Sequence, residues 1–403
     1  MRIAMVSEHA SPLADVGSVD AGGQNVHVAA LAKGLVERGH DVTVFTRRDD
    51  HSLAARITSS DGYVVEHVMA GPPTDIPKDE LLKHMPAFAH YLGTRWLSER
   101  FDIVHSHFWM SGMASVAGAA AAEIPVVHTF HALGTVKRRH QGGRDTSPPE
   151  RIAIEMRLCR TVDRVVATCR DEIRELRALG MNTSRATVVP CGVDVNSFVP
   201  TPRPPTGPPR LLVLGRLVER KGVGNVITAL GELPGVELVI AGGPERDALS
   251  ADPEVCRLRK LAEDNGSADR VTFVGRVHRG DVPTLISSVD VVVAVPWYEP
   301  FGIVPLEAMA CGRPVVGSAV GGLLDTIVPG HTGELVPPRR PDVLAGALRS
   351  LLADPERQAA YGSAGYERAV RIYRWEQVAA ATEAVYASVL ERAAHAASAE
   401  AVR

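Results

Sequence analysis

The chain has 403 residues, of which 45% are hydrophobic and 23% are charged, and its formal net charge is -3. This length and balance are typical of a globular protein of about two or three domains, and they give no electrostatic argument for a nucleic-acid partner. The five cysteines contain no CxxC pair. We therefore expect a reducing, cytoplasmic environment, without a disulfide framework or a zinc site. No window approaches the ~18 apolar residues of a transmembrane segment, although peripheral membrane contact and oligomeric state stay open.

The first half of the chain alternates short apolar runs with segments of helical periodicity. A strand, a glycine-containing loop, a helix and a second strand in succession indicate a doubly wound α/β domain. The pair Gly22-Gly23 follows the first strand, where it would let a ligand approach the backbone, although plain turn chemistry is the commoner reason for such a pair. The expected strands are 2–7, 41–46, 63–67, 103–107, 125–131, 164–168 and 187–190, and the expected helices are 25–38, 81–99 and 113–122.

Residues 199–210, VPTPRPPTGPPR, hold six prolines and predict a stiff linker, because proline cannot continue a helix or a central strand. The strand–helix alternation then restarts. We expect residues 1–198 and 211–374 to form two Rossmann-like domains, with a ligand cleft between their strand ends. Residues 375–397 predict a long amphipathic helix that could cap the second domain. The expected strands of this half are 211–215, 236–242, 271–274, 290–295, 314–318 and 333–336.

The most informative stretch is Val293–Gly312, VAVPWYEPFGIVPLEAMACG. A buried strand, a glycine-containing loop and a helix start would direct backbone N–H groups and a helix dipole toward an anion. Glu299 and Glu307 lie in the same stretch and can accept hydrogen bonds from sugar hydroxyls. An anion and a sugar together suggest a nucleotide sugar.

A basic loop, GRLVERKG, follows the strand at 211–215. Arg216 and Lys221 in this loop could neutralise a diphosphate leaving group, Arg through paired N–H groups and Lys as a point charge. A solvated basic loop is the alternative interpretation of this octet taken alone.

Seven motifs occur in an order that resembles the family 4 retaining glycosyltransferases of the GT-B fold, and the resemblance covers nearly the whole chain. Within that family the chain is similar to the mycothiol-pathway inositol-phosphate glycosyltransferases and to the sucrose-phosphate synthases. The resemblance implies a C-terminal helix that crosses back to the first domain, and no cofactor or metal requirement. The motifs are GGQN, HSHFW, HTFH, GRLVERKG, FVGRV, EPFGIVPLEAMACGRPVV and GLLDTIVPGHTGELV.

The resemblance also implies roles in catalysis. Arg216 and Lys221 would stabilise the leaving diphosphate while the acceptor hydroxyl attacks from the same face and passes its proton to a phosphate oxygen. His131 would touch the donor sugar near the reacting carbon, and Glu299 would bind its hydroxyls. Further donor contacts are implied for Gly23, Val277, Phe301, Gly302, Ile303 and Glu307, among which Glu307 would hold the ribose and Val277 would lie beside a uracil or guanine base.

The acceptor side is less defined. Lys78 matches a lysine that binds the acceptor phosphate in the inositol-phosphate enzymes. The tyrosine, threonine and arginine that accompany it there are replaced by Phe108, Ala132 and, by alignment, Ala153. We therefore expect a small sugar or polyol acceptor, with a phosphate group left open. Other candidate acceptor contacts are Lys137, Arg138, Asn25 and Trp109; the basic pair Lys137-Arg138 could equally be a solvated surface loop.

Four histidines, His105, His107, His128 and His131, end two neighbouring strands and could suggest a metal site. No carboxylate or cysteine pattern accompanies them, so we expect His105 and His128 to form hydrogen bonds within the sheet and no metal to bind. Two alternatives to a transferase stay open. One is a sugar-nucleotide epimerase of similar architecture, and the other is a nucleotide-sugar-binding protein without activity.

Overall fold

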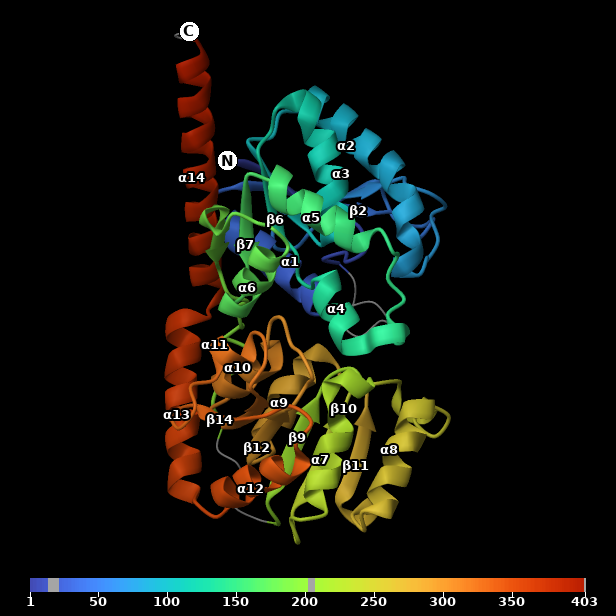
Figure 1. Ribbon diagram of the computed structural model, residues 1–403, viewed down its shortest axis with the longest axis vertical. Helices are drawn as coiled ribbons and strands as arrows, with labels where there is room; N and C mark the ends of the chain where they lie inside the picture. The colour runs from blue at the N-terminus through green and yellow to red at the C-terminus, as the bar shows by residue number, and fades with distance from the viewer. Residues whose placement is uncertain (14–21, 202–206, 402–403) are drawn as a thin grey trace. The chain divides into compact units, whose positions relative to one another are not determined.

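The computed structural model describes residues 1–13, 22–201 and 207–401, which form two compact units (Figure 1). Unit 1 comprises Met1–Pro190 and Trp375–Arg403, and unit 2 comprises Cys191–Arg374. The boundary therefore precedes the linker expected at 199–210, of which residues 202–206 lie outside the described part. The reason is that the segment after Pro190 is built into unit 2: the backbone N–H of Val193 donates to the carbonyl oxygen of Tyr373 at 2.7 Å, and Phe198 packs in the unit 2 core.

Unit 1 is built on a sheet whose described strands run in the order β3-β4-β2-β1-β5-β6-β7-β8. All neighbouring pairs are parallel except β3 with β4. The strand β3 has no counterpart among the expected strands, because three residues are too few to show a period. The strands are β1 Arg2–Val6, β2 Asp41–Arg47, β3 Arg56–Thr58, β4 Val64–Val68, β5 Ile103–His107, β6 Val126–Thr129, β7 Arg164–Ala167 and β8 Ala186–Val188.

The direction of winding in unit 1 reverses at β1, which lies between β2 and β5. Ligands of doubly wound sheets bind outside the carboxyl ends of the strands at such a point. The chain segments that follow β1, β5 and β6 are therefore the ones that position a site. The helices of unit 1 are α1 Gly23–Glu37, α2 Met85–Ser98, α3 Trp109–Ala119, α4 Gly134–Gln141, α5 Arg151–Thr161, α6 Arg170–Ala178 and α14 Trp375–Ala401.

The C-terminal helix α14 packs on α1 of unit 1, as the family resemblance implies. The approach is close at Gly34, where an added Cβ would lie 2.9 Å from Cβ of Ala379. Tyr386 of α14 is buried, and its hydroxyl lies 2.7 Å from Nδ1 of His105 in β5. The sequence alternative in which this helix caps only the second domain is thus not what the structure shows.

Unit 2 contains a second sheet, in which the described strands are all parallel and run in the order β11-β10-β9-β12-β13-β14. Its winding reverses between β9 and β12. The strands are β9 Arg210–Leu214, β10 Glu237–Ala241, β11 Val271–Gly275, β12 Val291–Ala294, β13 Val315–Ser318 and β14 Gly333–Val336. The helices are α7 Val223–Leu230, α8 Pro253–Asp264, α9 Val282–Ser287, α10 Ile303–Ala310, α11 Leu323–Thr326, α12 Pro341–Leu352 and α13 Pro355–Ile372.

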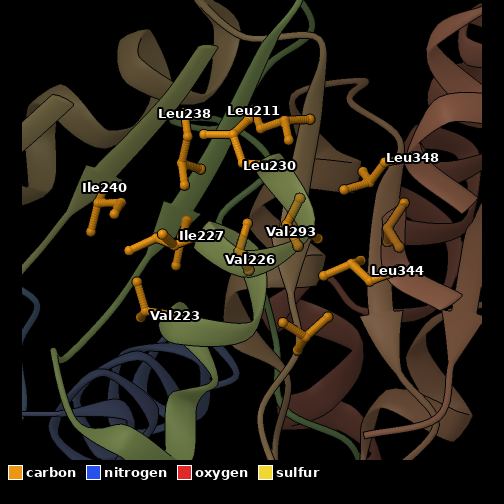
Figure 2. Close-up of a cluster of buried hydrophobic side chains, with 14 of the residues drawn as sticks. Leu211, Val223, Val226, Ile227, Leu230, Leu238, Ile240, Val293, Leu344 and Leu348 are labelled. Atoms are coloured by element: carbon orange, nitrogen blue, oxygen red, sulfur yellow. The ribbon is translucent and has the colours of Figure 1, made fainter. Parts of the chain in front are cut away.

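Figure 2 shows a cluster of buried hydrophobic side chains that covers one face of the unit 2 sheet. Val226 and Ile227 of α7 pack against one face of the sheet, and Leu344 of α12 joins the same cluster. A second cluster, which includes Val292 and Leu306, covers the other face. Strands covered on both faces need apolar side chains at successive positions, which explains the sequence VVVA of β12.

Candidate active site

In unit 2, the loop after β9 and the loop after β12 are joined by close backbone contacts. Gly222 has φ +74°, and a Cβ there would lie 2.0 Å from the carbonyl oxygen of Val295, so only glycine fits. The backbone N–H of Trp297 donates to the carbonyl oxygen of Arg220 at 2.8 Å. These contacts bring the expected basic loop and the two-glutamate stretch to the same edge of the sheet.

Lys221 and Glu299 form an ion pair at this edge. Burial opposes the ionisation of Glu299, but Lys221, followed by Arg220 and Arg216, holds its pKa below the ordinary value. The carboxylate is therefore ionised and can accept hydrogen bonds from hydroxyls. The ammonium group carries three N–H donors, so it can also meet a phosphate oxygen. Arg216 lies exposed on the same loop.

The helix α10 begins directly after Gly302, whose φ is +75°. Phe301, Gly302 and Ile303 thus present the first backbone groups of the helix, as expected for contacts to sugar hydroxyls. Glu307 lies farther along α10 and is buried, which raises the pKa of its carboxyl group although Arg279 opposes the shift. Arg279 forms an ion pair with Glu307.

Arg279 was missed by the sequence reasoning, although it lies two positions after the half-buried Val277, the residue expected beside the base. Its guanidinium carbon lies 4.7 Å from the centroid of the Phe198 ring, so the side chain is held by an aromatic contact as well as by Glu307. Arg279 could have been identified from the sequence, because it lies in the same loop as Val277, which was already predicted to contact the base.

In unit 1, the side chain of Asn25 caps the start of α1. Its Oδ1 accepts from the backbone N–H of Gly22 at 3.0 Å, and its Nδ2 donates to the carbonyl oxygen of Ser11 at 3.0 Å. The expected acceptor contact through Asn25 therefore competes with a capping role. Among the described residues, no atom lies within 4 Å of a Cβ added at Gly22.

An arginine that the sequence analysis did not consider, Arg151, lies beside Phe108 in unit 1. The guanidinium carbon of Arg151 lies 5.1 Å from the centroid of the Phe108 ring, and Nζ of Lys78 lies 5.5 Å from the same centroid. Arg151 also donates to the carbonyl oxygen of Ala132 at 2.6 Å and, through Nε, to Glu155 at 2.8 Å. The structure therefore places an arginine of the first turn of α5 next to Phe108, two positions before Ala153.

The aromatic residues at this point differ in what they offer to a ligand. Phe108 directly follows β5 and has φ +80°, a conformation rare for a residue with a side chain, and such strain is concentrated at functional positions. Trp109 is only 1% exposed, so its ring supports Arg151 and offers little surface to an acceptor. The ring of His9, a residue that the sequence reasoning missed, lies 4.8 Å from that of Phe108, and its Nδ1 is 2.7 Å from Oε1 of the buried Glu8. An adjacent carboxylate and imidazole after the first strand could have been noticed.

The basic run in the second half of α4 is partly neutralised. Nζ of Lys137 lies 3.1 Å from Oδ1 of Asp145 and 2.9 Å from Oγ of Ser147. Arg138 is exposed. The structure therefore gives Lys137 a local partner, whereas the contacts with an acceptor stay a prediction for both residues.

The histidines of β5 and β6 are buried and hydrogen-bonded. Nδ1 of His105 contacts the Tyr386 hydroxyl, its Nε2 lies 2.9 Å from Oγ1 of Thr129, and Nδ1 of His128 lies 2.8 Å from Oγ of Ser106. The expected structural role of His105 and His128 is confirmed. Within the described ranges, no group of three His, Cys, Asp or Glu side chains could hold a metal ion.

Two Rossmann-like units, each with candidate ligand residues at the carboxyl ends of its strands, define a glycosyltransferase of the GT-B class. A model of Glycosyltransferase Family 4 matches residues 21–197, and one of Glycosyl transferases group 1 matches residues 196–368. The chain belongs to glycosyltransferase family 4.

Curated relatives and solved structures agree with this assignment. The D-inositol 3-phosphate glycosyltransferase of Kineococcus radiotolerans is 36% identical, over 98% of this chain and 97% of that protein. A D-inositol 3-phosphate glycosyltransferase 2 of Catenulispora acidiphila is 34% identical, over 97% and 95%. The sucrose-phosphate synthase of Thermosynechococcus elongatus superposes with a TM-score of 0.88 at 32% identity, over 97% and 99%. HepE of Anabaena, solved with UDP-glucose, shares the fold at 20% identity, with a TM-score of 0.72 over 98% and 100%.

None of the described helices combines the length and the apolar character that crossing a bilayer requires.

Proposed function

We propose that this glycosyltransferase moves a hexosyl group, with retention of configuration, from a UDP- or GDP-linked sugar to a hydroxyl of a small phosphorylated acceptor. The observation that carries the proposal is the ion pair of Lys221 with the ionised Glu299, next to the start of α10. A cation, a carboxylate and helix N–H groups together suit a diphosphate and a sugar.

In the proposed mechanism, the acceptor oxygen forms a bond to the anomeric carbon as the bond to the diphosphate breaks. The acceptor proton passes to an oxygen of the departing phosphate. Arg216 and Lys221 stabilise the negative charge that develops there. Glu307, with Arg279, holds the ribose hydroxyls, and Glu299 orients the sugar. The reaction needs no cofactor, so we expect protein treated with a chelator to keep its activity.

The acceptor half of the proposal rests on unit 1. Lys78 and Arg151 bring two cations to one aromatic ring, which favours an acceptor with a phosphate group. The curated relatives are named for inositol 3-phosphate, so a cyclitol phosphate is the first acceptor to test. Phe108 and Ala132 carry no hydroxyl at positions where those enzymes are expected to have one. Because this difference could change the acceptor, a hexose phosphate is the second acceptor to test.

The test is a panel of donors with and without acceptors. UDP-glucose, UDP-N-acetylglucosamine, GDP-mannose and ADP-glucose are incubated with inositol 3-phosphate, a hexose phosphate and their unphosphorylated forms, and the product is identified by mass spectrometry. The anomeric coupling constant in the NMR spectrum reports retention or inversion. Release of the nucleotide without a glycoside product for any acceptor would contradict a transferase function of the kind proposed.

A further inference from the structure

A small cavity of unit 2 lies between helix α13, which packs against β14, and the loop that precedes β14 (Figure 1). Its volume is about 200 Å³, and it is lined by His331, Ala364, Glu367, Arg368 and Arg371. His331 lies two positions before β14, at the amino ends of the parallel strands, whereas Lys221 and Glu299 follow the carboxyl ends of β9 and β12. The cavity therefore belongs to the opposite edge of the sheet from the candidate active site.

The guanidinium group of Arg368 is fixed in one orientation. Its Nε donates to the carbonyl oxygen of Thr326 at 3.1 Å, and its Nη2 donates to the carbonyl oxygen of Asp325 at 2.7 Å and to the hydroxyl of Tyr373 at 3.2 Å. All three acceptors are uncharged, and Arg368 forms no ion pair within the part of the chain that the structure describes. Nη1 takes no part in these bonds, so its two N–H groups are available to a ligand.

A second cation, Arg371, lies one turn farther along α13 and is exposed. Its guanidinium group forms no hydrogen bond or ion pair among the described residues. The helix dipole also favours a cation in the last turn, but that explanation does not account for a cavity beside a second, fixed guanidinium group. Of the five lining residues only Glu367 carries a carboxylate, so the lining has an excess of positive charge.

The loop that carries His331 is held by its own hydrogen bonds. Gly330 has φ +72°, and its backbone N–H donates to the carbonyl oxygen of Gly333 at 3.0 Å. Thr332 is fully buried, and its Oγ1 accepts from the backbone N–H of Val328 at 2.9 Å. This loop belongs to the GLLDTIVPGHTGELV motif, to which the proposed reaction assigns no role. His331 is exposed, so its ring can donate to an anion in the cavity.

We propose that this cavity binds a phosphate group, either as inorganic phosphate or as part of a small phosphate monoester. Arg368 and Arg371 supply guanidinium donors, which suit phosphate oxygens, and His331 supplies a further N–H group. The volume of about 200 Å³ lies below the roughly 300–1,000 Å³ of sites for drug-sized ligands, so the cavity is too small to enclose a nucleotide. The site is separate from the proposed glycosyl transfer and does not depend on it.

Calorimetric titration of the full chain tests the site. The double variant Lys78→Met/Lys221→Ala serves as background, because it removes two cations expected to bind phosphate groups in the proposed reaction. Inorganic phosphate and glycerol 3-phosphate are the probes, and glycerol is the control without phosphate. We expect saturable binding of at least one probe and none of glycerol; the probe that binds more tightly shows which form of phosphate the site takes. No saturable binding of either probe would overturn the proposal.

Two variants with opposite expected effects locate the bound phosphate. Arg371→Gln removes a cation from an exposed position, so the variant should fold, and its Kd should rise about 10-fold to 100-fold through the loss of one hydrogen bond to a charged group. Glu367→Gln removes the opposing carboxylate, so its Kd should fall roughly twofold to fivefold. An unchanged Kd in the first variant, or a raised Kd in the second, would contradict binding in this cavity.

The matched control is Arg357→Gln, because Arg357 lies in the first turn of the same helix and pairs with Asp354. It removes the same charge and should leave the Kd unchanged; a rise equal to that of Arg371→Gln would mean that only the overall charge matters, against the proposal. The ring of His331 gives a direct readout. Its ¹H–¹³C signals, assigned by comparison with His331→Gln, should move as phosphate is added, and fixed signals during phosphate binding would exclude this cavity.

Discussion

Glu299 and Glu307 are both buried carboxyl groups of unit 2, yet their pKa values shift in opposite directions. Burial raises the pKa of both carboxyl groups. At Glu299 the effect of three cations exceeds that of burial, whereas at Glu307 the effect of Arg279 alone does not. In the proposed mechanism, the ionised carboxylate of Glu299 would bind the sugar, and the more readily protonated carboxyl group of Glu307 would bind the ribose.

Replacement of Lys221 tests the diphosphate contact. Lys221→Ala removes the cation beside the leaving group, and we expect kcat to fall by roughly 10²–10³, by analogy with the loss of an oxyanion donor. Turnover of the active donor is measured by release of its nucleotide. Lys260→Ala is the control, because Lys260 is an exposed lysine of the same unit that pairs with Asp264. Full activity of the Lys221→Ala variant would show that Lys221 does not stabilise the leaving diphosphate.

Replacement of Lys78 tests the acceptor phosphate. Lys78→Met keeps the aliphatic stem but removes the charge, so KM for a phosphorylated acceptor should rise about 10-fold to 100-fold, the loss of one charge-assisted hydrogen bond. KM for the unphosphorylated analogue should not change. Lys83→Met, an exposed position on the same short helix, is the control. Equal effects on both acceptors would mean that Lys78 does not recognise phosphate.

At the scale of elements, the site of unit 2 depends on how closely the loop after β9 approaches the end of β12. Gly222→Ala forces a Cβ against the carbonyl oxygen of Val295, in addition to the strain of φ +74°. Gly235→Ala has the same φ but no atom within 4 Å of the added Cβ, so it isolates the backbone strain.

We expect Gly235→Ala to lower the free energy of unfolding by about 1 kcal/mol and Gly222→Ala to lower it clearly more. Only Gly222→Ala should also weaken UDP binding, because it displaces the loop that carries Lys221. Urea unfolding and calorimetric titration with UDP measure the two effects. Equal losses of stability in the two variants would contradict the close contact.

The attachment of α14 to unit 1 can be tested at Tyr386. Tyr386→Phe removes the hydroxyl and leaves Nδ1 of His105 buried without that partner, which should cost about 1–3 kcal/mol of unfolding free energy. Amide hydrogen exchange in α14 should become faster. Tyr366→Phe, a half-buried tyrosine of unit 2, should leave both measurements unchanged. Unaltered stability in the Tyr386 variant would show that the hydrogen bond contributes little.

At the scale of the whole molecule, the buried histidines make folding sensitive to acid. Burial lowers the pKa of His128 to about 3, while an unfolded histidine titrates near ~6.5. The unfolded state therefore binds the proton first, so the contribution of His128 to stability is complete above pH ~6.5 and declines below it. The buried carboxyl groups with raised pKa values, such as Glu172 and Glu307, act in the opposite direction, and a variant is needed to isolate one histidine.

His128→Asn removes the titrating group and keeps an amide near Ser106. The difference in unfolding free energy between wild type and variant should narrow by about 2 kcal/mol between pH 7 and pH 5, from ~1.4 kcal/mol per pH unit below ~6.5. Urea unfolding at the two pH values measures it. A constant difference would show that His128 keeps an ordinary pKa in the folded protein.

The strand pattern and both Rossmann-like sheets could be predicted from the sequence. Parallel strands covered on both faces need continuous apolar runs, and such a run is visible in a short stretch of sequence. Gly222 and Gly302 lie in two motifs that the sequence analysis quoted, but their positive φ values were seen only in the structure. The unit boundary was placed too late, because the proline-rich stretch is visible in the sequence whereas the hydrogen bond from Val193 to Tyr373 is not.

Side-chain partners were decided by the tertiary structure. Lys221 and Glu299 are 78 positions apart and pair only because two loops meet at one sheet edge. Arg151 reaches Phe108 because α5 begins beside the end of β5, and an alignment by position pointed to Ala153 instead. The sequence alone therefore determined the family, the fold and which loops matter, because these follow from local patterns. The ion pairs and the contacts between histidine rings follow from long-range contacts that only the folded chain creates.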